Sequence, residues 1–540
     1  MVSRLHIPPS YTGGFLMRLG SAKSIGLVGL KAFVINAQAF ISPGLPYFSI
    51  IGLPDASLSE SRERVKSACS SCGFRWPQTR VTVNLSPASR PKRGSSHDLA
   101  IATSVLGAGG VVPVEGFEQT IALGELNLDG SVLPITGVLP ILAYAKELGV
   151  QRVFLPEANM EEAAIVPGIE VTGLMHLGQL VEHMGGRAIY HIPDTVVDSG
   201  QTTDITIQDQ NAPGATNLDM DQVIGQEGTK WALTVAAAGG HHILMVGPPG
   251  AGKSMMARCL PGILPPLGAK EQLEVASIRS LCGTLKQYGV SDIPPFEAPH
   301  HTASMASLVG GGSGLATPGA ITKAHCGVLF MDEAPEFSPR ALQALREPLE
   351  IGEIILSRAK GSTSFPARFQ LVMAANPCPC GYGYGTGERC TCSPRERTRY
   401  WNRISGPIMD RIDIQTTVPP VSDLGGASPN VTGLGHGDAG HRQSSAEIRQ
   451  QVIMAREAAG KRFKEEGWTC NAQAGGEWLR ANTGQKSLAV VNEAMRKKHL
   501  SLRGADRTLR LAWTLADLDG RYGPNVDDVA VGIMMRTRTA

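Results

Sequence analysis

The chain has 540 residues, too many for one hydrophobic core, so three or four folding units are expected. Apolar residues make up 42% of the chain and charged residues 18%, which excludes wholesale disorder, and a formal charge of +2 gives no global basic field for a polyanion. The sequence has neither an apolar run long enough to span a bilayer nor a secretory leader, so we expect a cytoplasmic protein with no membrane partner.

The first predicted unit, residues 18–195, mixes short β-rich runs with helical stretches. The predicted strands include 31–40, 80–85 and 151–155, and the predicted helices include 57–72 and 139–148. This mixture is typical of an α/β domain. Residues 196–216 are rich in Asp, Gly, Thr and Gln and show little apolar periodicity, which is the composition of a linker.

The second predicted unit, residues 217–421, contains a phosphate-binding loop after a short apolar strand, 243–246. The loop matches all eight positions of the pattern GxxxxGK[ST]: Gly247, Pro248, Pro249, Gly250, Ala251, Gly252, Lys253 and Ser254. Backbone N–H groups and the following helix N-terminus favour phosphate, while Lys253 supplies a point charge and Ser254 a hydroxyl for magnesium. The motif predicts ATP and Mg2+ as cofactors.

Polar side chains follow two later strands of the same unit. The strand 327–331 ends in Asp332 and Glu333. We expect Asp332 to hold the magnesium through water and Glu333 to polarise the water that attacks the γ-phosphate. The strand 369–375 is followed by Asn376, whose amide is placed to orient that water, as the first sensor residue does in AAA+ proteins.

A cysteine cluster comes directly after Asn376. It consists of two Cys-x-Cys pairs separated by nine residues: Cys378, Cys380, Cys390 and Cys392. Four thiolates on one short loop suit a structural Zn2+, although surface thiols or redox chemistry remain alternatives. The stretch 389–403 adds five arginines beside Tyr400 and Trp401, which indicates either a nucleic-acid stacking patch or a subunit interface.

Three arginines are candidates for two kinds of contact with a nucleotide phosphate. Arg411 lies in a polar break before a strand and resembles the arginine finger of ring ATPases, with a surface ion pair to Asp410 or Asp413 as the alternative. Arg503 lies where a C-terminal helical unit would place a second sensor, and Arg507, one helical turn on, competes for that role.

The last predicted unit, residues 444–540, is helical and forms the lid. It follows a Gly- and Ser-rich linker, 422–443. The segment 444–447 offers a capping box, and residues 488–518 show helical spacing. The fold class expected for the whole chain is therefore α/β, with a central phosphate-loop domain of αβα layers and a helical C-terminal domain.

Four segments carry a resemblance to a known family: 48–55, 298–302, 368–381 and 406–413. They resemble the ComM/YifB family, often described as magnesium-chelatase-like. The resemblance implies a homohexameric AAA+ ATPase of the helix-two-insert clade. It also implies DNA as the partner, because ComM members are branch-migrating DNA helicases that act in recombination during natural transformation.

The same resemblance assigns a role to residues 350–365, which lie between Glu333 and Asn376. Relatives of this branch insert a hairpin into the ring's central channel at this place. Arg358 and Lys360 at the predicted tip are candidates for contacts with DNA phosphates, and a solvated turn is the alternative.

The N-terminal unit is similar to the Lon protease domain. Ser96 falls at the position of the Lon nucleophile, but the position of the catalytic lysine falls on Leu139. Without that base the serine is not activated, so we expect a proteolytically inactive Lon-like α+β domain. Lys146, two helical turns further on, is the alternative base.

Together these features favour an ATP-driven DNA motor with helicase or branch-migration activity. The alternatives are a chelatase-type ATPase that remodels a protein partner, a Lon-type protease, and an ATP-switched scaffold without motor activity.

Overall fold

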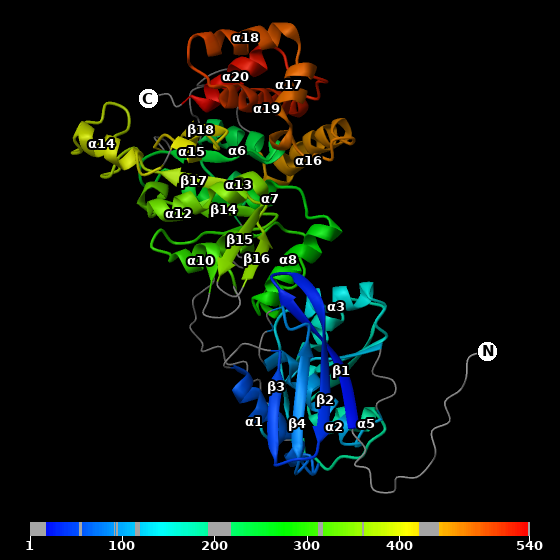
Figure 1. The fold of residues 1–540 in the computed structure, drawn as a ribbon. Coiled ribbons are helices and arrows are strands. Elements are labelled where there is room, and N and C mark those ends of the chain that lie inside the picture. Colours follow the sequence, from blue (N-terminus) through cyan, green and yellow to red (C-terminus); the bar gives the residue numbers. More distant parts are fainter. Residues whose placement is uncertain are drawn as a thin grey trace.

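The computed structural model describes residues 18–52, 57–90, 92, 95–113, 119–192, 218–311, 317–358, 361–404, 406–420 and 442–537. Three units follow one another along the long axis of the molecule: an N-terminal α/β unit, a central α/β unit and a C-terminal helical unit (Figure 1). The predicted linker 196–216 lies outside the described residues, as does most of 422–443.

The N-terminal unit is built on a mixed seven-stranded sheet. The strand order is β3-β4-β2-β1-β5-β8-β9. The strands are β1 (Arg18–Val28), β2 (Lys31–Ser42), β3 (Tyr47–Ile51), β4 (Arg80–Ser86), β5 (Thr120–Ala122), β8 (Arg152–Pro156) and β9 (Glu170–Leu174). β1 and β2 form a long antiparallel hairpin, whereas β5, β8 and β9 are parallel. This pattern confirms the predicted α/β mixture.

Helices cover this sheet and bury its apolar side chains. They are α1 (Ser57–Ser71), α2 (Asp98–Ala108), α3 (Val138–Glu147), α4 (Met160–Ala163) and α5 (Leu177–His183). Every residue of α2 is buried, because the helix packs against both β1 and β2. The predicted strands and helices of this unit agree with the structure to within two residues at each end.

The N-terminal unit contacts the central unit through α3 and α8 (Ala269–Leu281). The backbone N–H of Leu139 donates to Glu162 Oε1 at 2.9 Å and to Ser280 Oγ at 3.3 Å. Ala276 and Leu285 complete an apolar cluster with Leu139, which is fully buried. The position at which a Lon protease would carry its lysine therefore belongs to a domain contact here.

The central unit is built on a five-stranded sheet whose strands are all parallel. The order is β11-β14-β17-β10-β18. The strands are β10 (Ile243–Val246), β11 (Phe296–Glu297), β14 (Val328–Met331), β17 (Gln370–Ala375) and β18 (Ile414–Thr417). Every residue of β10, β14 and β17 is buried, as expected for strands covered on both faces.

Helices on both faces of the central sheet make the three αβα layers that the sequence predicts. They include α6 (Glu227–Gly239), α7 (Lys253–Ile263), α10 (Met305–Val309), α12 (Pro339–Ala344), α13 (Arg346–Ile351), α14 (Pro394–Trp401) and α15 (Gly406–Met409). One apolar cluster joins α6 and α7 to one face of the sheet, and another joins α12 and α15 to the opposite face. The helix α14 projects from the side of this unit (Figure 1).

A hairpin of β15 (Glu353–Arg358) and β16 (Gly361–Pro366) follows α13 and confirms the hairpin predicted for 350–365. Lys360 at its tip lies outside the described residues, and the side chain of Arg358 is not described either. Their contact with DNA stays a prediction.

The C-terminal unit consists of α16 (Ser445–Arg462), α17 (Gly476–Asn482), α18 (Gln485–Arg496), α19 (Leu502–Leu518) and α20 (Val526–Arg536). Ser444 and Glu447 form the predicted capping box at the start of α16. α16 and α19 pack on α6 of the central unit, so the lid is joined to the side of the sheet that carries β18. Among the described residues, no helix is both long and apolar enough to cross a membrane.

Candidate ATP-binding site and its surroundings

The phosphate-binding loop connects β10 to α7 at the carboxyl edge of the central sheet. Gly250 and Gly252 have φ angles of 78° and 86°, values that L side chains rarely adopt. These turns let the backbone wrap around a phosphate at the N-terminus of α7. The glycines at these two positions are therefore required by the loop conformation.

Lys253 points into the loop. Its ammonium donates to the carbonyl oxygens of Gly247 at 2.7 Å and Pro248 at 2.9 Å, and to Asn376 Oδ1 at 3.2 Å. Burial lowers the pKa of the Lys253 ammonium, while the carboxylates of Asp332 and Glu333 oppose that shift. Strands β10 and β17 thus bring two of the predicted catalytic residues within hydrogen-bond distance.

The predicted magnesium residues also meet. Ser254 Oγ donates to Asp332 Oδ2 at 2.6 Å, although the two residues are 78 positions apart in the chain. A hydroxyl and a carboxylate are the hard oxygen donors that Mg2+ prefers, so these side chains fit that ion. When bound, Mg2+ would neutralise charge on the β- and γ-phosphates.

Glu333 lies at the end of β14 with a left-handed φ of 50°, which is uncommon for a residue other than glycine. Its carboxylate is half exposed and lies 3.3 Å from His301 Nδ1. From the sequence, the adjacent histidines His300 and His301 are candidates for metal ligation or for loop packing, and neither interpretation includes Glu333. Two adjacent histidines carry no pattern that predicts contact with an acid 32 residues after His301, so this pair is visible only in the structure.

Arg411 lies at the opposite edge of the sheet. It precedes β18, which runs parallel to β10, so it is at the amino end of the strands whereas the phosphate loop is at the carboxyl end. Its guanidinium is paired with Glu350 rather than with Asp410 or Asp413. This position excludes contact with the phosphate loop of its own chain, and the role of Arg411 as an arginine finger stays a prediction.

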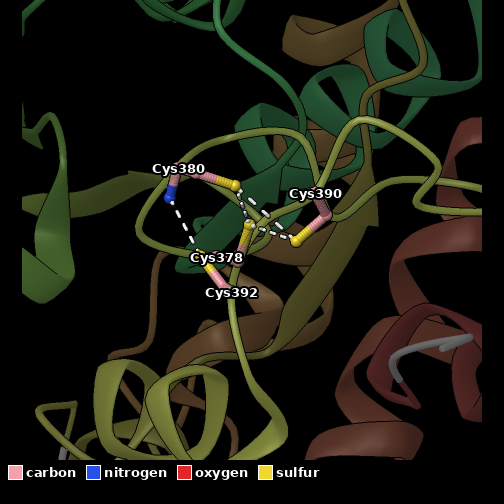
Figure 2. Close-up of side chains that lie close together, drawn as sticks. All are labelled: Cys378, Cys380, Cys390 and Cys392. Carbon is pink, nitrogen blue, oxygen red and sulfur yellow. Dashed lines mark hydrogen bonds between the residues drawn. The ribbon is translucent and has the colours of Figure 1, made fainter.

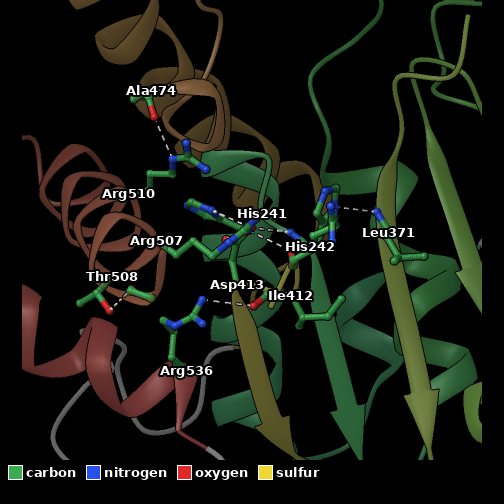
Figure 3. A network of polar contacts seen from close by, with 12 residues as sticks. His241, His242, Leu371, Ile412, Asp413, Ala474, Arg507, Thr508, Arg510 and Arg536 are labelled. Atoms are coloured by element: carbon green, nitrogen blue, oxygen red, sulfur yellow. Dashed lines mark hydrogen bonds and ion pairs between the residues drawn. The ribbon is translucent and has the colours of Figure 1, made fainter. Parts of the chain in front are cut away.

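Asp413, two residues after Arg411, is the centre of a buried polar network (Figure 3). Arg507 donates to Asp413 Oδ1 and, at 2.9 Å, to the carbonyl oxygen of Arg411. The backbone N–H of His242 donates to Asp413 Oδ2 at 3.2 Å, and His241 lies 3.6 Å from the same oxygen. Arg507 therefore fastens α19 to the segment that carries Arg411.

Arg503, one helical turn before Arg507, is exposed in the first turn of α19. Because Arg507 contacts the amino edge of the sheet, Arg503 lies closer to that edge than to the phosphate loop of its own chain. Its role as a second sensor stays a prediction.

Removing Arg507 is expected to destabilise the lid. Arg507→Ala would leave the carboxylate of Asp413 buried without its main partner, which costs about 3 kcal/mol. Burial alone would raise the pKa of Asp413, but the charge of Arg507 and the nearby imidazole of His241 hold that pKa well below its ordinary value. The stabilisation is therefore complete above the unfolded pKa of 3.8 and is lost as the pH falls below that value.

Thermal unfolding of the wild type and of Arg507→Ala at several pH values measures this effect. The difference in unfolding temperature should be large near neutral pH and should shrink on acidification. A difference that grows on acidification would contradict the assignment. Arg496→Ala, which removes an exposed arginine in the same unit, is the control.

The four cysteines form one compact cluster after β17 (Figure 2). Cys378 Sγ lies 3.3 Å from Cys380 Sγ and 3.5 Å from Cys390 Sγ, and the backbone N–H of Cys380 donates to Cys392 Sγ at 3.4 Å. Sulfurs at about 2.3 Å from a tetrahedral zinc ion are about 3.8 Å apart, so this arrangement fits the metal. None of the ten cysteines is disulfide-bonded.

The thiols of the cluster have different surroundings. Backbone hydrogen bonding, foremost from Tyr382, lowers the pKa of Cys380 to about 5. Burial raises the pKa of Cys378 to about 12. Binding of a cation would draw the remaining protons from such a set.

The cysteine cluster is joined to the nucleotide site. Cys378 follows Asn376 by only two residues, and a Cβ at Gly381 would lie 2.7 Å from the ring of Pro249 in the phosphate loop. Trp401 of α14 donates from Nε1 to the carbonyl oxygen of Pro377 at 3.0 Å. The cysteine-bearing loop therefore packs against the phosphate-binding loop.

The two aromatic residues beside the arginine-rich stretch differ in exposure, so Tyr400 is not available for a stacking patch, one of the two alternatives that the sequence offers beside a subunit interface. Tyr400 is buried, because it faces the body of the unit from α14, and Trp401 is only partly exposed. Four arginines of the stretch remain exposed without an acidic partner among the ion pairs described: Arg389, Arg395, Arg397 and Arg399. Arg389 stacks over Tyr382 and Arg397 donates to Cys390 Sγ at 3.2 Å.

In the N-terminal unit, Ser96 lies in a short 3-10 turn and is partly exposed. Lys146 donates from its ammonium to the carbonyl oxygen of Pro167 at 2.7 Å. The neighbouring residues Arg93 and Gly94 lie outside the described residues.

The central unit has a parallel sheet with a phosphate loop, an acidic pair and a strand-end asparagine, and it is joined to a helical lid. These features define the class of the protein: it is a magnesium-chelatase-like AAA+ protein, and AAA+ proteins are a class of ATPases. Three family descriptions match the chain: magnesium chelatase, subunit ChlI, at 219–424; subunit ChlI of Mg-chelatase at 38–159; and magnesium chelatase, subunit ChlI C-terminal, at 442–536.

The chain belongs to the ComM/YifB family. It is 37% identical over 504 residues to the competence protein ComM of Haemophilus influenzae, a match that covers 93% of this chain and 94% of the relative. It is 44% identical over 523 residues to an uncharacterized protein of Mycobacterium tuberculosis, which covers 96% and 99%. The N-terminal unit also resembles the Lon protease of Rhizobium meliloti, with 25% identity over 175 residues that cover 30% of this chain and 21% of the relative.

Proposed function

We propose that this chain is an ATP-driven DNA motor, a helicase or branch-migration translocase that acts in homologous recombination during natural transformation in the cytoplasm. The observation that carries the proposal is the separation of the catalytic parts onto opposite edges of one sheet. Lys253, Glu333 and Asn376 lie at the carboxyl edge, whereas Arg411 lies at the amino edge. The likeness to a competence protein supports DNA as the substrate.

The placement of the catalytic residues on opposite edges of the sheet favours a homo-oligomeric ring. Asp332 would hold the magnesium, Glu333 would activate water, and the arginine that offsets transition-state charge would come from the next chain. A closed ring of identical head-to-tail contacts lets every chain both hold a nucleotide and supply an arginine. Six chains are the number that the family resemblance implies.

In such a ring the β15–β16 hairpin is the proposed DNA contact. It lies in the chain between the acidic pair and Asn376, and its second strand leads into the amino end of β17, the strand that Asn376 follows. Cations at its tip, Arg358 and Lys360, would follow the phosphate backbone without reading sequence.

Migration of a synthetic four-way DNA junction tests this proposal. The purified protein with ATP should convert the junction to two duplexes, and Arg358→Ala/Lys360→Ala should lose most of that activity while ATP still binds. No migration and no strand displacement on any branched substrate would reject the DNA motor.

A second candidate is a chelatase-like ATPase that remodels a protein partner. The match to magnesium chelatase subunit ChlI over 219–424 favours it. Its ATPase activity would be indifferent to DNA, which separates it from the motor.

We further propose that Cys378, Cys380, Cys390 and Cys392 hold a structural Zn2+. The short sulfur separations and the shared loop support this assignment over surface thiols or a redox pair. The metal would fix the loop that packs on Pro249.

Metal analysis tests the zinc site. The wild type should contain about one zinc per chain, and Cys378→Ser should lose it, with a lower unfolding temperature and weaker binding of a fluorescent ATP analogue. Cys282→Ser, which lies outside the cluster, should behave as the wild type. Wild-type protein that carries no zinc after purification without chelators would contradict the site.

A further inference from the structure

The guanidinium of Arg411 is held by its own chain. Nη1 donates to the carbonyl oxygen of Pro407 at 2.6 Å, and Nη2 pairs with Glu350 Oε1. Only 11% of the Arg411 side chain is exposed. The guanidinium is therefore turned inward, and its anionic partner is the carboxylate of Glu350.

Glu350 lies at the base of the hairpin. It is the penultimate residue of α13, and β15 begins at Glu353. The backbone N–H of Ala367 donates to the carbonyl oxygen of Gly352 at 2.7 Å, which closes the base of the hairpin beside Glu350. A displacement of the hairpin would therefore move the carboxylate that holds Arg411.

We propose that Glu350 is a positioning residue that withholds Arg411 until the hairpin moves, and so links DNA contact by one chain to ATP hydrolysis on its neighbour. This inference rests on the proposed function. An arginine cannot bind the carboxylate and the phosphate with the same N–H groups, so the two acceptors compete. When DNA displaces the hairpin, the ion pair between Arg411 and Glu350 weakens, and Arg411 binds the phosphate instead.

Glu350→Gln tests the restraint, because it keeps the size of the side chain and removes the charge. The DNA-independent kcat for ATP should rise by about two- to fivefold, the size expected of a half-exposed ion pair. The KM for ATP should stay unchanged, because the phosphate loop lies at the other edge of the sheet. The ratio of the ATPase rates with and without forked DNA should fall toward one, since Arg411 is already released from Glu350.

Two control variants make the test specific. Glu347→Gln removes an exposed acid from the same helix and should keep the wild-type kcat and stimulation. Glu350→Gln combined with Arg411→Ala should be as slow as Arg411→Ala alone, because the gain acts through the arginine. Unfolding temperature and ring size should be equal in all the Glu350 and Glu347 variants.

A Glu350→Gln enzyme with unchanged or lower kcat, in intact rings, would overturn the restraint. Failure of the proposed function has a different signature, because the wild type itself would then show no stimulation by DNA. In that case the DNA-independent kcat of Glu350→Gln still decides whether Glu350 restrains Arg411.

Discussion

Glu333→Gln should lower the steady-state rate of ATP hydrolysis by about 10²–10⁴-fold, the usual contribution of a general base. The carboxylate stands at the end of β14 beside Asp332, where it can polarise water but is not needed to bind phosphate. The variant should therefore keep the affinity of the wild type for a fluorescent ATP analogue. Its rings should become more stable in ATP, because bound nucleotide is no longer hydrolysed.

Lys253→Ala is the contrasting variant for that experiment. It removes the ammonium that lies between the loop carbonyls and Asn376, so binding of nucleotide itself should be lost. If Glu333→Gln hydrolysed ATP at more than about a tenth of the wild-type rate, Glu333 would not be the general base.

Arg411→Ala should lower hydrolysis by about 10³-fold or more, the effect seen when an arginine finger is removed. Arg411 lies at the edge of the sheet away from its own phosphate loop. A neighbouring chain with an intact Arg411 should therefore restore hydrolysis. Rings assembled from Arg411→Ala and Glu333→Gln chains should regain activity, although each variant alone is inactive. The sites that regain it combine the intact Glu333 of one chain with the intact Arg411 of the next.

Mixed rings of Lys253→Ala and Glu333→Gln chains are the matched control. Both substitutions damage the same half of the composite site, so no interface in such rings is complete and no activity should return. Equal activity in the two mixtures would show that Arg411 does not act across an interface.

Features that are local in sequence were predictable. The strand at 243–246 has the bounds of β10, and the four cysteines meet because they share one short loop. The expected helical run 488–518 is broken into α18 and α19, since Lys498 takes a positive φ of 59° and Ser501 caps a new helix. A capping serine inside a periodic run is a weak signal, so the break was missed.

Contacts between distant residues were not predictable. The partner of Arg411 is Glu350, 61 residues away, rather than the adjacent acids that the sequence suggested. Arg507 meets Asp413 across 94 residues, and this pair decides which edge of the sheet the lid arginines face. Such pairings depend on how the hairpin and the lid pack, and one sequence carries no pattern for either.

The measurement that tests the central claim most directly is the steady-state ATPase rate with and without forked or single-stranded DNA, with Glu333→Gln as the inactive control. A DNA motor predicts a clear stimulation by DNA that disappears in Glu333→Gln. An ATPase rate that is lost in Glu333→Gln but indifferent to DNA would contradict the DNA motor and favour a chelatase-like ATPase acting on a protein partner.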